Sequence, residues 1–309
     1  MILTSEQYDS DDIPMIHAFQ IIIIRSAKII ASLLILLLFV IGVSAFVCSW
    51  AIKVTQYDLS LDGLQKQMRL VVVADTHGKV FRANNEPLYK KVEAQHPDAV
   101  ILLGDLFPSD PEKDDLEYVI ELTRRMQEIS QVYFAMGNHE KTYTAKYGGD
   151  WISQLSETGA IVLVESWGDY SIAGNTVRLG STLGHGFSFG RTEAAYKASQ
   201  EYAVLTALEN SPYPPILLAH MPDTAAFEDS KRNWHIDLVL SAHTHGGVIR
   251  IPGKGGLYVP MQGWWPRYDY GEIMLNEKMR MIITSGLSGH GKVPRIFNLP
   301  EIAVIDLYP

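Results

Sequence analysis

The sequence predicts an α/β protein preceded by one membrane-spanning helix, and three observations lead to this prediction. Short apolar runs recur from residue 68 onward, each followed by polar residues or glycine, which is the pattern of buried β-strands. Segments with helical character lie between several of these runs, as in α/β chains. A long uncharged apolar stretch lies near the N-terminus, and its length is typical of a helix in a bilayer.

Residues 29–52 form this apolar stretch, which contains 24 residues and no charged side chain. A cleavable signal peptide is the main alternative to a membrane anchor, because Val43-Ser44-Ala45 offers small residues at which cleavage could occur. The apolar stretch continues past this point, whereas the apolar part of a signal peptide usually has only about 7–15 residues. We therefore expect an uncleaved signal anchor over residues 29–52, preceded by a short acidic tail over residues 1–28.

The charges beside the anchor bear on its orientation. Arg25 and Lys28 precede the apolar stretch, and Lys53 follows it. Basic residues favour the cytoplasmic side of a membrane. We expect a single-pass membrane protein with its N-terminus inside and its main domain outside the cytoplasm.

Six apolar runs are predicted to form buried strands. They cover residues 70–74, 99–103, 132–136, 161–164, 215–219 and 238–240. Residues 115–129 and 191–209 are predicted to be helices. We expect residues 53–67 to form a linker and the start of the main domain, and residues 68–309 to form one globular domain of α/β class.

Composition excludes several classes of protein. Apolar residues make up 47% of the chain and charged residues 20%, which excludes general disorder. The formal charge of -9 argues against a nucleic-acid partner, because sequence-independent binders need many Lys and Arg side chains. Cys48 is the only cysteine, so no disulfide forms within the chain, and we expect its thiol to be buried or to face lipid.

Five of the predicted strands end in polar residues that can bind metal ions. These endings are Asp75-Thr76-His77-Gly78, Gly104-Asp105, Gly137-Asn138-His139-Glu140, His220 and His243-Thr244-His245-Gly246-Gly247. Ligands bind at the carboxyl ends of strands in open α/β sheets, so we expect these residues to share one crevice. Each motif alone also has a structural explanation as a turn or helix cap. Their joint occurrence, each after an apolar run, favours a functional site.

The kinds of side chain in these motifs indicate which ions they could hold. Carboxylates, imidazoles and an amide oxygen, without thiolates, suit Mn²⁺, iron or Zn²⁺. The candidates are too numerous for one ion. Two ions about 3.5–4 Å apart can hold both the nucleophile and the leaving oxygen of a displacement at phosphorus. The expected cofactors are therefore two divalent metal ions, of manganese, iron or zinc.

The five motifs, in this order, resemble those of the calcineurin-like metallophosphoesterases, whose pattern is D-x-H, G-D, G-N-H-[DE], H and G-H-x-H. Residues 237–247 and 285–301 are similar to the membrane-associated YkuE/YaeI-like branch, and the resemblance covers about residues 54–309. It implies a four-layer αββα sandwich, in which two mixed β-sheets are flanked by helices. Ala242 and Met221 stand where the family usually has glycine and asparagine, but neither position supplies a ligand.

The resemblance also implies roles for the residues of the five motifs. It assigns Asp75, His77 and His245 to the first metal, Asn138, His220 and His243 to the second, and Asp105 to a bridging position. His139 would lie beside the metals and protonate the leaving oxygen or stabilise the transition state. The nucleophile would be a metal-bound hydroxide attacking in line.

Two further segments contain candidate substrate-binding residues. Trp265 and Arg267 belong to a dense aromatic and cationic stretch, Trp264-Trp265-Pro266-Arg267-Tyr268, for which ordinary packing, a substrate lip and a membrane-interface contact are all open. Arg295 is either structural or faces a phosphate.

The expected activity is hydrolysis of a phosphodiester, pyrophosphate or phosphomonoester, on a lipid- or envelope-linked substrate that a membrane tether would bring close. The alternative is a non-catalytic, membrane-anchored scaffold that keeps the fold. A metal-dependent amide or lactam hydrolase would need an H-x-H-x-D-H motif, and the sequence has none.

Overall fold

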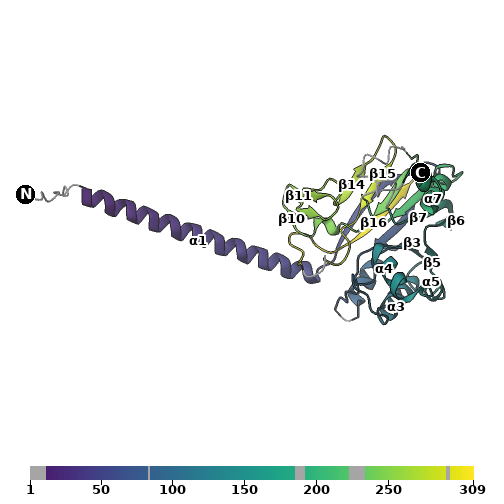
Figure 1. Ribbon diagram of the computed structural model, residues 1–309, viewed down its shortest axis with the longest axis horizontal. Helices are drawn as coiled ribbons and strands as arrows, with labels where there is room; N and C mark the ends of the chain where they lie inside the picture. The colour runs from purple at the N-terminus through teal and green to yellow at the C-terminus, as the bar shows by residue number, and fades with distance from the viewer. Residues whose placement is uncertain (1–11, 83, 185–191, 223–233, 290–292) are drawn as a thin grey trace, which may run out of the picture.

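The computed structural model describes residues 12–82, 84–184, 192–222, 234–289 and 293–309, with side chains from Phe19 onward. One long helix, α1 (Asp12–Trp50), projects from a globular domain that contains all the other described elements (Figure 1).

Helix α1 begins much earlier than the sequence predicted, at Asp12 and not at Ile29. The predicted tail is therefore helical from Asp12 onward. Pro14 lies in the first turn, where a missing N–H is tolerated, and no other proline interrupts the helix. Its segment Phe19–Trp50 is long and apolar enough to cross a membrane, and the most apolar part is not buried by the domain.

One six-stranded sheet forms the first half of the domain. Its strands, in spatial order, are β1 (Lys53–Ser60), β16 (Glu301–Tyr308), β2 (Met68–Val73), β3 (Ala99–Leu103), β4 (Val132–Ala135) and β5 (Ile161–Leu163). Strands β2 to β5 are parallel, whereas β16 runs antiparallel to β2. Strand β1 pairs with β16 along its whole length, so the sheet already begins at Lys53.

A second six-stranded sheet forms the other half. Its order is β14 (Gly271–Met274), β15 (Arg280–Ile283), β9 (Leu238–Ser241), β8 (Pro215–Ala219), β7 (Asn175–Thr182) and β6 (Trp167–Ile172). The four inner strands are parallel and both edge strands are antiparallel. Two hairpins pair β10 (Arg250–Ile251) with β11 (Gly255–Gly256) and β12 (Tyr258–Val259) with β13 (Gly263–Trp264).

The alternation of side chains along the strands produces four layers. In β2, Leu70 and Val72 pack between the sheets against residues such as Leu218 of β8, while Val71 and Val73 point to the opposite face. That outer face packs against α2 (Glu86–Glu93), α3 (Asp115–Gln127) and α5 (Trp151–Ser156). Helix α7 (Gln200–Glu209) covers the outer face of the second sheet. The predicted αββα sandwich is therefore confirmed.

All six predicted strands are present, with ends within two residues of their expected positions. The helix predicted over residues 191–209 is wrong as a single element, because it divides into α6 (Glu193–Lys197) and α7. Ser199 has an extended backbone at the break, and its hydroxyl accepts a hydrogen bond from Tyr202 N at 3.3 Å. A serine in this role starts a new helix.

Methionine truncations at two positions test the helix-facing core. Met126 of α3 is fully buried, whereas Met274 of β14 is 45% exposed. We expect Met126→Ala to lower the free energy of unfolding by about 2–5 kcal/mol through lost burial and a residual cavity, and Met274→Ala to change it by less than about 0.5 kcal/mol. Urea unfolding of the detergent-solubilised chain measures both, and equal losses would contradict this assignment of the core.

Candidate metal centre

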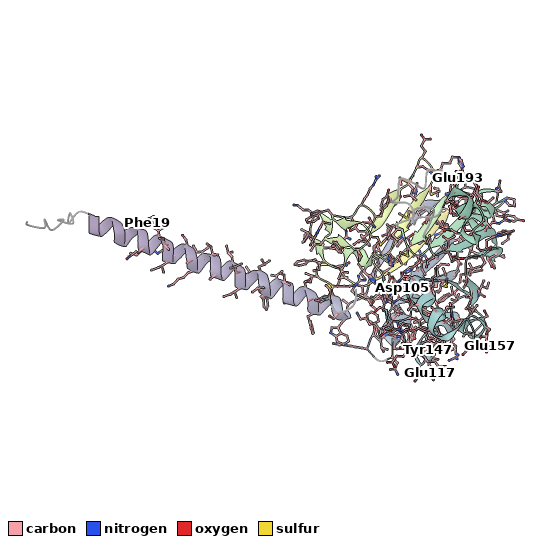
Figure 2. All side chains as sticks on the ribbon, viewed as in Figure 1. Phe19, Asp105, Glu117, Tyr147, Glu157 and Glu193 are labelled. Carbon is pink, nitrogen blue, oxygen red and sulfur yellow. The ribbon has the colours of Figure 1, made fainter. Side chains whose placement is uncertain are left out.

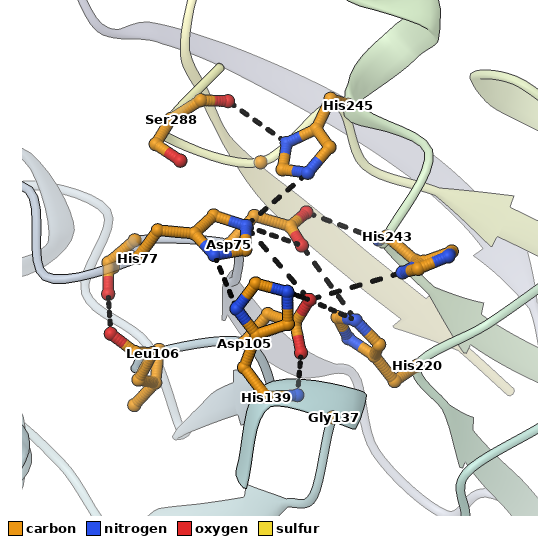
Figure 3. Close-up of polar contacts among 12 residues, drawn as sticks. Asp75, His77, Asp105, Leu106, Gly137, His139, His220, His243, His245 and Ser288 are labelled. Carbon is orange, nitrogen blue, oxygen red and sulfur yellow. Dashed lines mark hydrogen bonds and ion pairs between the residues drawn. The ribbon is translucent and has the colours of Figure 1, made fainter. Parts of the chain in front are cut away.

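The predicted ligands come together at the carboxyl ends of parallel strands from both sheets (Figure 3). Asp75 and His77 follow β2, and Asp105 follows β3. Asn138 is the first residue of α4 (Asn138–Tyr147), directly after β4. From the second sheet, His220 follows β8 and His243 and His245 follow β9, where His245 begins the short 3-10 helix η1 (His245–Gly247).

Asp75, His77 and His245 form one group, with potential ligand atoms that lie within 4.8 Å of one another. His77 Nε2 is 3.3 Å from His245 Nε2 and 4.0 Å from Asp75 Oδ1. These are the three residues that the family resemblance assigns to the first metal. Atoms this close to one another could bind the same ion.

Asp105, His220 and His243 form a second group within the same limit. Asp105 Oδ2 lies 3.2 Å from His220 Nε2 and 4.0 Å from His243 Nδ1. The same oxygen is 4.0 Å from His77 Nε2 in the first group. The Asp105 carboxylate therefore stands between the two groups, where a bridging ligand would have to be.

Two of the imidazoles are oriented by backbone carbonyls on their far sides. His220 Nδ1 is 2.7 Å from Leu103 O, and His245 Nδ1 is 3.0 Å from Ser288 O. Because Nδ1 donates to the carbonyl in each case, Nε2 is the ring nitrogen that faces the centre. This arrangement is the usual support of a metal-binding histidine.

His139 lies beside both groups at the start of α4. Its backbone N–H donates to Asp105 Oδ1 at 2.9 Å, and its Nε2 is 3.5 Å from Asp105 Oδ2. Its Nδ1 is 3.1 Å from both Phe107 O and His77 Nδ1. His139 also forms a third close group with His77 and Asp105, so distance alone does not distinguish it from the ligands.

Several buried polar atoms at this centre make no hydrogen bond within the described part of the chain. They are Asp75 Oδ1, Asp105 Oδ2, Asn138 Oδ1, His220 Nε2 and His243 Nδ1. Buried polar groups rarely remain unsatisfied unless a ligand or a catalytic role accounts for them. Every one belongs to a predicted metal ligand, so the side chains present fit the binding of divalent cations.

The backbone at the centre adopts conformations that are costly for residues with a Cβ atom. Asp75, His77, Asp105, His243 and His245 all have positive φ angles, between 47° and 66°. Such strain costs about 1–3 kcal/mol per residue and concentrates at functional sites. Five of the seven predicted ligands carry it, which indicates that the fold holds them in place against their local preference.

Glu140 is a supporting residue whose role the motif alone did not show. It is fully buried, and its carboxylate accepts hydrogen bonds from the backbone N–H groups of Asp105, Leu106 and Gly137 at 2.8–2.9 Å. The loop after β3 is thereby tied to the start of α4. A Cβ at Gly137 would collide with the Asp105 carboxylate, so glycine is required for this close approach.

Burial and neighbouring charge shift the pKa values of the candidate ligands in different directions. Burial lowers the pKa of His77 to about 3 and that of His245 well below its usual value. Burial opposes ionisation of Asp105, but the charge of His220 outweighs it, and the pKa of Asp105 lies well below its usual value. Burial also opposes the charge of His220, but the Asp105 carboxylate outweighs it and raises the pKa of His220 to about 10, while burial raises the pKa of Asp75 to about 7. Neutral imidazoles and ionised carboxylates are the forms that bind metals, so a bound cation would have to displace a proton from His220.

A cavity of about 420 Å³ opens beside the centre. Its lining includes His77, His139, Ser288 and Lys79. Lys79 was not among the predicted site residues, although it follows His77 by only two positions. Burial lowers its pKa to about 8, and its Nζ lies 4.5 Å from the centre of the Phe81 ring. No acidic partner of Lys79 occurs within 4 Å among the residues that the structure describes.

None of the three predicted substrate-binding residues belongs to this lining. Arg295 is 4% exposed, and its guanidinium donates to the carbonyls of Ser285, Ser288 and Leu299. It thus supports the same Ser288 carbonyl that orients His245. Trp265 is 51% exposed next to the β12–β13 hairpin, and Arg267 lies over the Tyr268 ring at 5.3 Å.

Comparisons with known proteins agree with this geometry. Residues 68–247 match the model of the calcineurin-like phosphoesterase family. An uncharacterized metallophosphoesterase of Campylobacter jejuni is 29% identical over 89% of this chain and 68% of its own length. A transmembrane protein with a metallophosphoesterase domain from Danio rerio is 31% identical over 83% of this chain and 56% of its own length. The uncharacterized metallophosphoesterase YkuE of Bacillus subtilis is 25% identical over 70% of each chain.

Replacement of Glu140 tests its supporting role. In Glu140→Gln, the side-chain NH₂ can only donate, so it cannot accept the hydrogen bond that a backbone N–H now gives to the carboxylate. We expect the loop that bears Asp105 to shift as a result. We expect Mn²⁺ affinity to fall about 10–100-fold, as measured by equilibrium dialysis and elemental analysis. Glu157→Gln, at an exposed position after α5, is the matched control. Unchanged affinity in Glu140→Gln would refute this role.

Proposed function

Because the chain belongs to the calcineurin-like phosphoesterase family, we propose that it is a binuclear metal-dependent phosphoesterase that hydrolyses a phosphodiester, pyrophosphate or phosphomonoester. The observation that carries this proposal is the position of Asp105 Oδ2 between two groups of potential ligands, one with His77 and one with His220 and His243. A single-metal site would not need a carboxylate in this position.

The proposed ligand set divides as the family pattern implies. Asp75, His77 and His245 would hold the first ion, Asn138, His220 and His243 the second, and Asp105 both. Two ions held in this way lower the pKa of bound water and neutralise charge on the phosphate. The chemistry of the side chains suits Mn²⁺, iron or Zn²⁺.

His139 is the proposed acid. Its Nε2 lies 3.5 Å from Asp105 Oδ2, and the ring also lines the cavity beside the centre. From this position the ring can give a proton to a leaving alkoxide or donate a hydrogen bond to the phosphate. Phe107 O, at 3.1 Å from Nδ1, fixes the ring and leaves Nε2 directed to the centre.

The proposed substrate is a phosphate ester linked to a lipid or to a cell-envelope component. Support comes from the N-terminal helix, whose segment Phe19–Trp50 meets the length and composition of a membrane span. A tether raises the local concentration of membrane-resident molecules around the site. In this proposal the catalytic domain lies outside the cytoplasm, because Arg25 and Lys28 precede the apolar stretch.

Removal of the bridging carboxylate tests the two-metal proposal. We expect the full-length protein with added Mn²⁺ to hydrolyse bis(p-nitrophenyl) phosphate, and Asp105→Asn to lose at least about 10³-fold in kcat/KM together with bound metal. Asp110→Asn, at an exposed side chain, is the control. A wild-type protein that binds no metal and hydrolyses no such ester would favour the scaffold alternative.

Replacement of His139 separates an acid from a ligand. We expect His139→Ala to keep its metal content and to lose about 10²–10⁴-fold in kcat. Elemental analysis and steady-state kinetics on the same preparation measure the two effects. Loss of one metal equivalent in His139→Ala would show that His139 is a ligand.

A further inference from the structure

The last turns of α1 pack against the catalytic domain. Ile41, Ser44 and Ala45 are half-buried and Cys48 is buried, whereas every residue from 19 to 40 is exposed. Their spacing places these four side chains on one face of the helix. Ser44 Oγ accepts a hydrogen bond from Phe297 N at 2.7 Å. The helix is therefore joined to the domain along its last turns, which Figure 1 shows passing the edge of the domain.

Two loops make these contacts, and both lead to the cavity beside the metal centre. The first loop, residues 79–82, begins at Lys79 in the cavity lining and ends at Arg82, whose guanidinium lies 4.8 Å from the centre of the Trp50 ring. The second loop follows Ser288 and Gly289 of the lining and reaches α1 through Phe297. Lys79 and Arg82 are only three residues apart, a reach of about 10 Å at most.

The length of the apolar helix places the bilayer surface at these contacts. A helix rises about 1.5 Å per residue, and the hydrocarbon core is about 30 Å thick. Counted from Phe19, this core of about 20 residues ends near Leu38; counted from Ile29, after Arg25 and Lys28, it ends near Cys48. The first count ends about one turn before the part of α1 that the two loops contact, and the second count ends within that part.

The same loops expose apolar side chains. Val80 is 52% exposed, Val293 47% and Phe297 40%. Phe297 lies against α1 at Ser44, and Val80 lies between Lys79 and Arg82. Lipid around the exposed part of α1 would lie beside these loops, because both loops contact the last turns of the helix.

We propose that Val80, Val293 and Phe297 form a membrane-contact face that holds the opening of the metal cavity at the bilayer surface. The occupant of this face is the headgroup region of the bilayer around the anchor. Lys79 then brings a positive charge to the level of the headgroup phosphates. As an extension that rests on the proposed function, a lipid phosphate ester would reach the metal centre without leaving the membrane.

Site-directed fluorescence tests the membrane contact directly. Single-cysteine forms of the full chain, Val80→Cys and Val293→Cys, are made with Cys48→Ala and labelled with an environment-sensitive fluorophore in phosphatidylcholine–phosphatidylglycerol nanodiscs. Glu157→Cys is the control, because Glu157 is exposed at the end of the domain far from α1 (Figure 2). We expect both loop labels to be blue-shifted and quenched by headgroup-spin-labelled lipid, with no such change at the control position. Loop labels that are quenched only by aqueous iodide, as at the control, would overturn the proposal.

Charge insertion provides a second measurement. We expect Val80→Glu with Val293→Glu to reduce lipid quenching of a label at Phe297→Cys about twofold or more, because carboxylates resist entry into the interface. Hydrolysis of water-soluble bis(p-nitrophenyl) phosphate should stay unchanged, since neither valine lines the cavity. Full quenching in the charged variant would overturn the proposal. Absence of hydrolysis in every form, with quenching as expected, would refute the proposed function and leave the membrane contact intact.

Discussion

The Asp105 carboxylate is the point on which the structure of the centre depends. One oxygen faces both groups of potential ligands, and the other accepts the backbone N–H of His139. This position requires the loop after β3 to approach the start of α4 closely, which the three hydrogen bonds to Glu140 and the absence of a side chain at Gly137 allow. Burial of a carboxylate costs free energy unless the charge is paired. The surrounding imidazoles and the proposed cations would offset this cost for Asp105.

The two-sheet architecture explains why ligands from distant parts of the chain meet there. Strands β2, β3 and β4 of the first sheet are parallel to one another, as are β8 and β9 of the second, and each ends at the centre. The packing of Leu70, Val72 and Leu218 between the sheets brings the two sets of strand ends together. The positive φ angles of five ligands show that this global packing overrides local backbone preference.

Helix α1 and the globular domain contact each other directly, although the sequence presents them as separate segments. Hydropathy identifies residues 29–52 as apolar, but it does not show which face of the helix meets protein. The contacts at Ser44, Cys48 and Trp50 depend on loops that are far away in the sequence. These contacts give the globular domain a defined orientation relative to α1.

The sequence by itself determined the strands and the order of the motifs, because each depends on a local apolar run followed by particular side chains. The family resemblance then implied which seven residues of the motifs are candidate ligands. Local pattern did not reveal the break at Ser199, the pairing of β1 with β16 or the start of α1 at Asp12. It also did not identify Lys79 as a cavity residue or distinguish Arg295 as a support of the Ser288 carbonyl. These features depend on contacts between residues distant in sequence, so only the tertiary structure decided them.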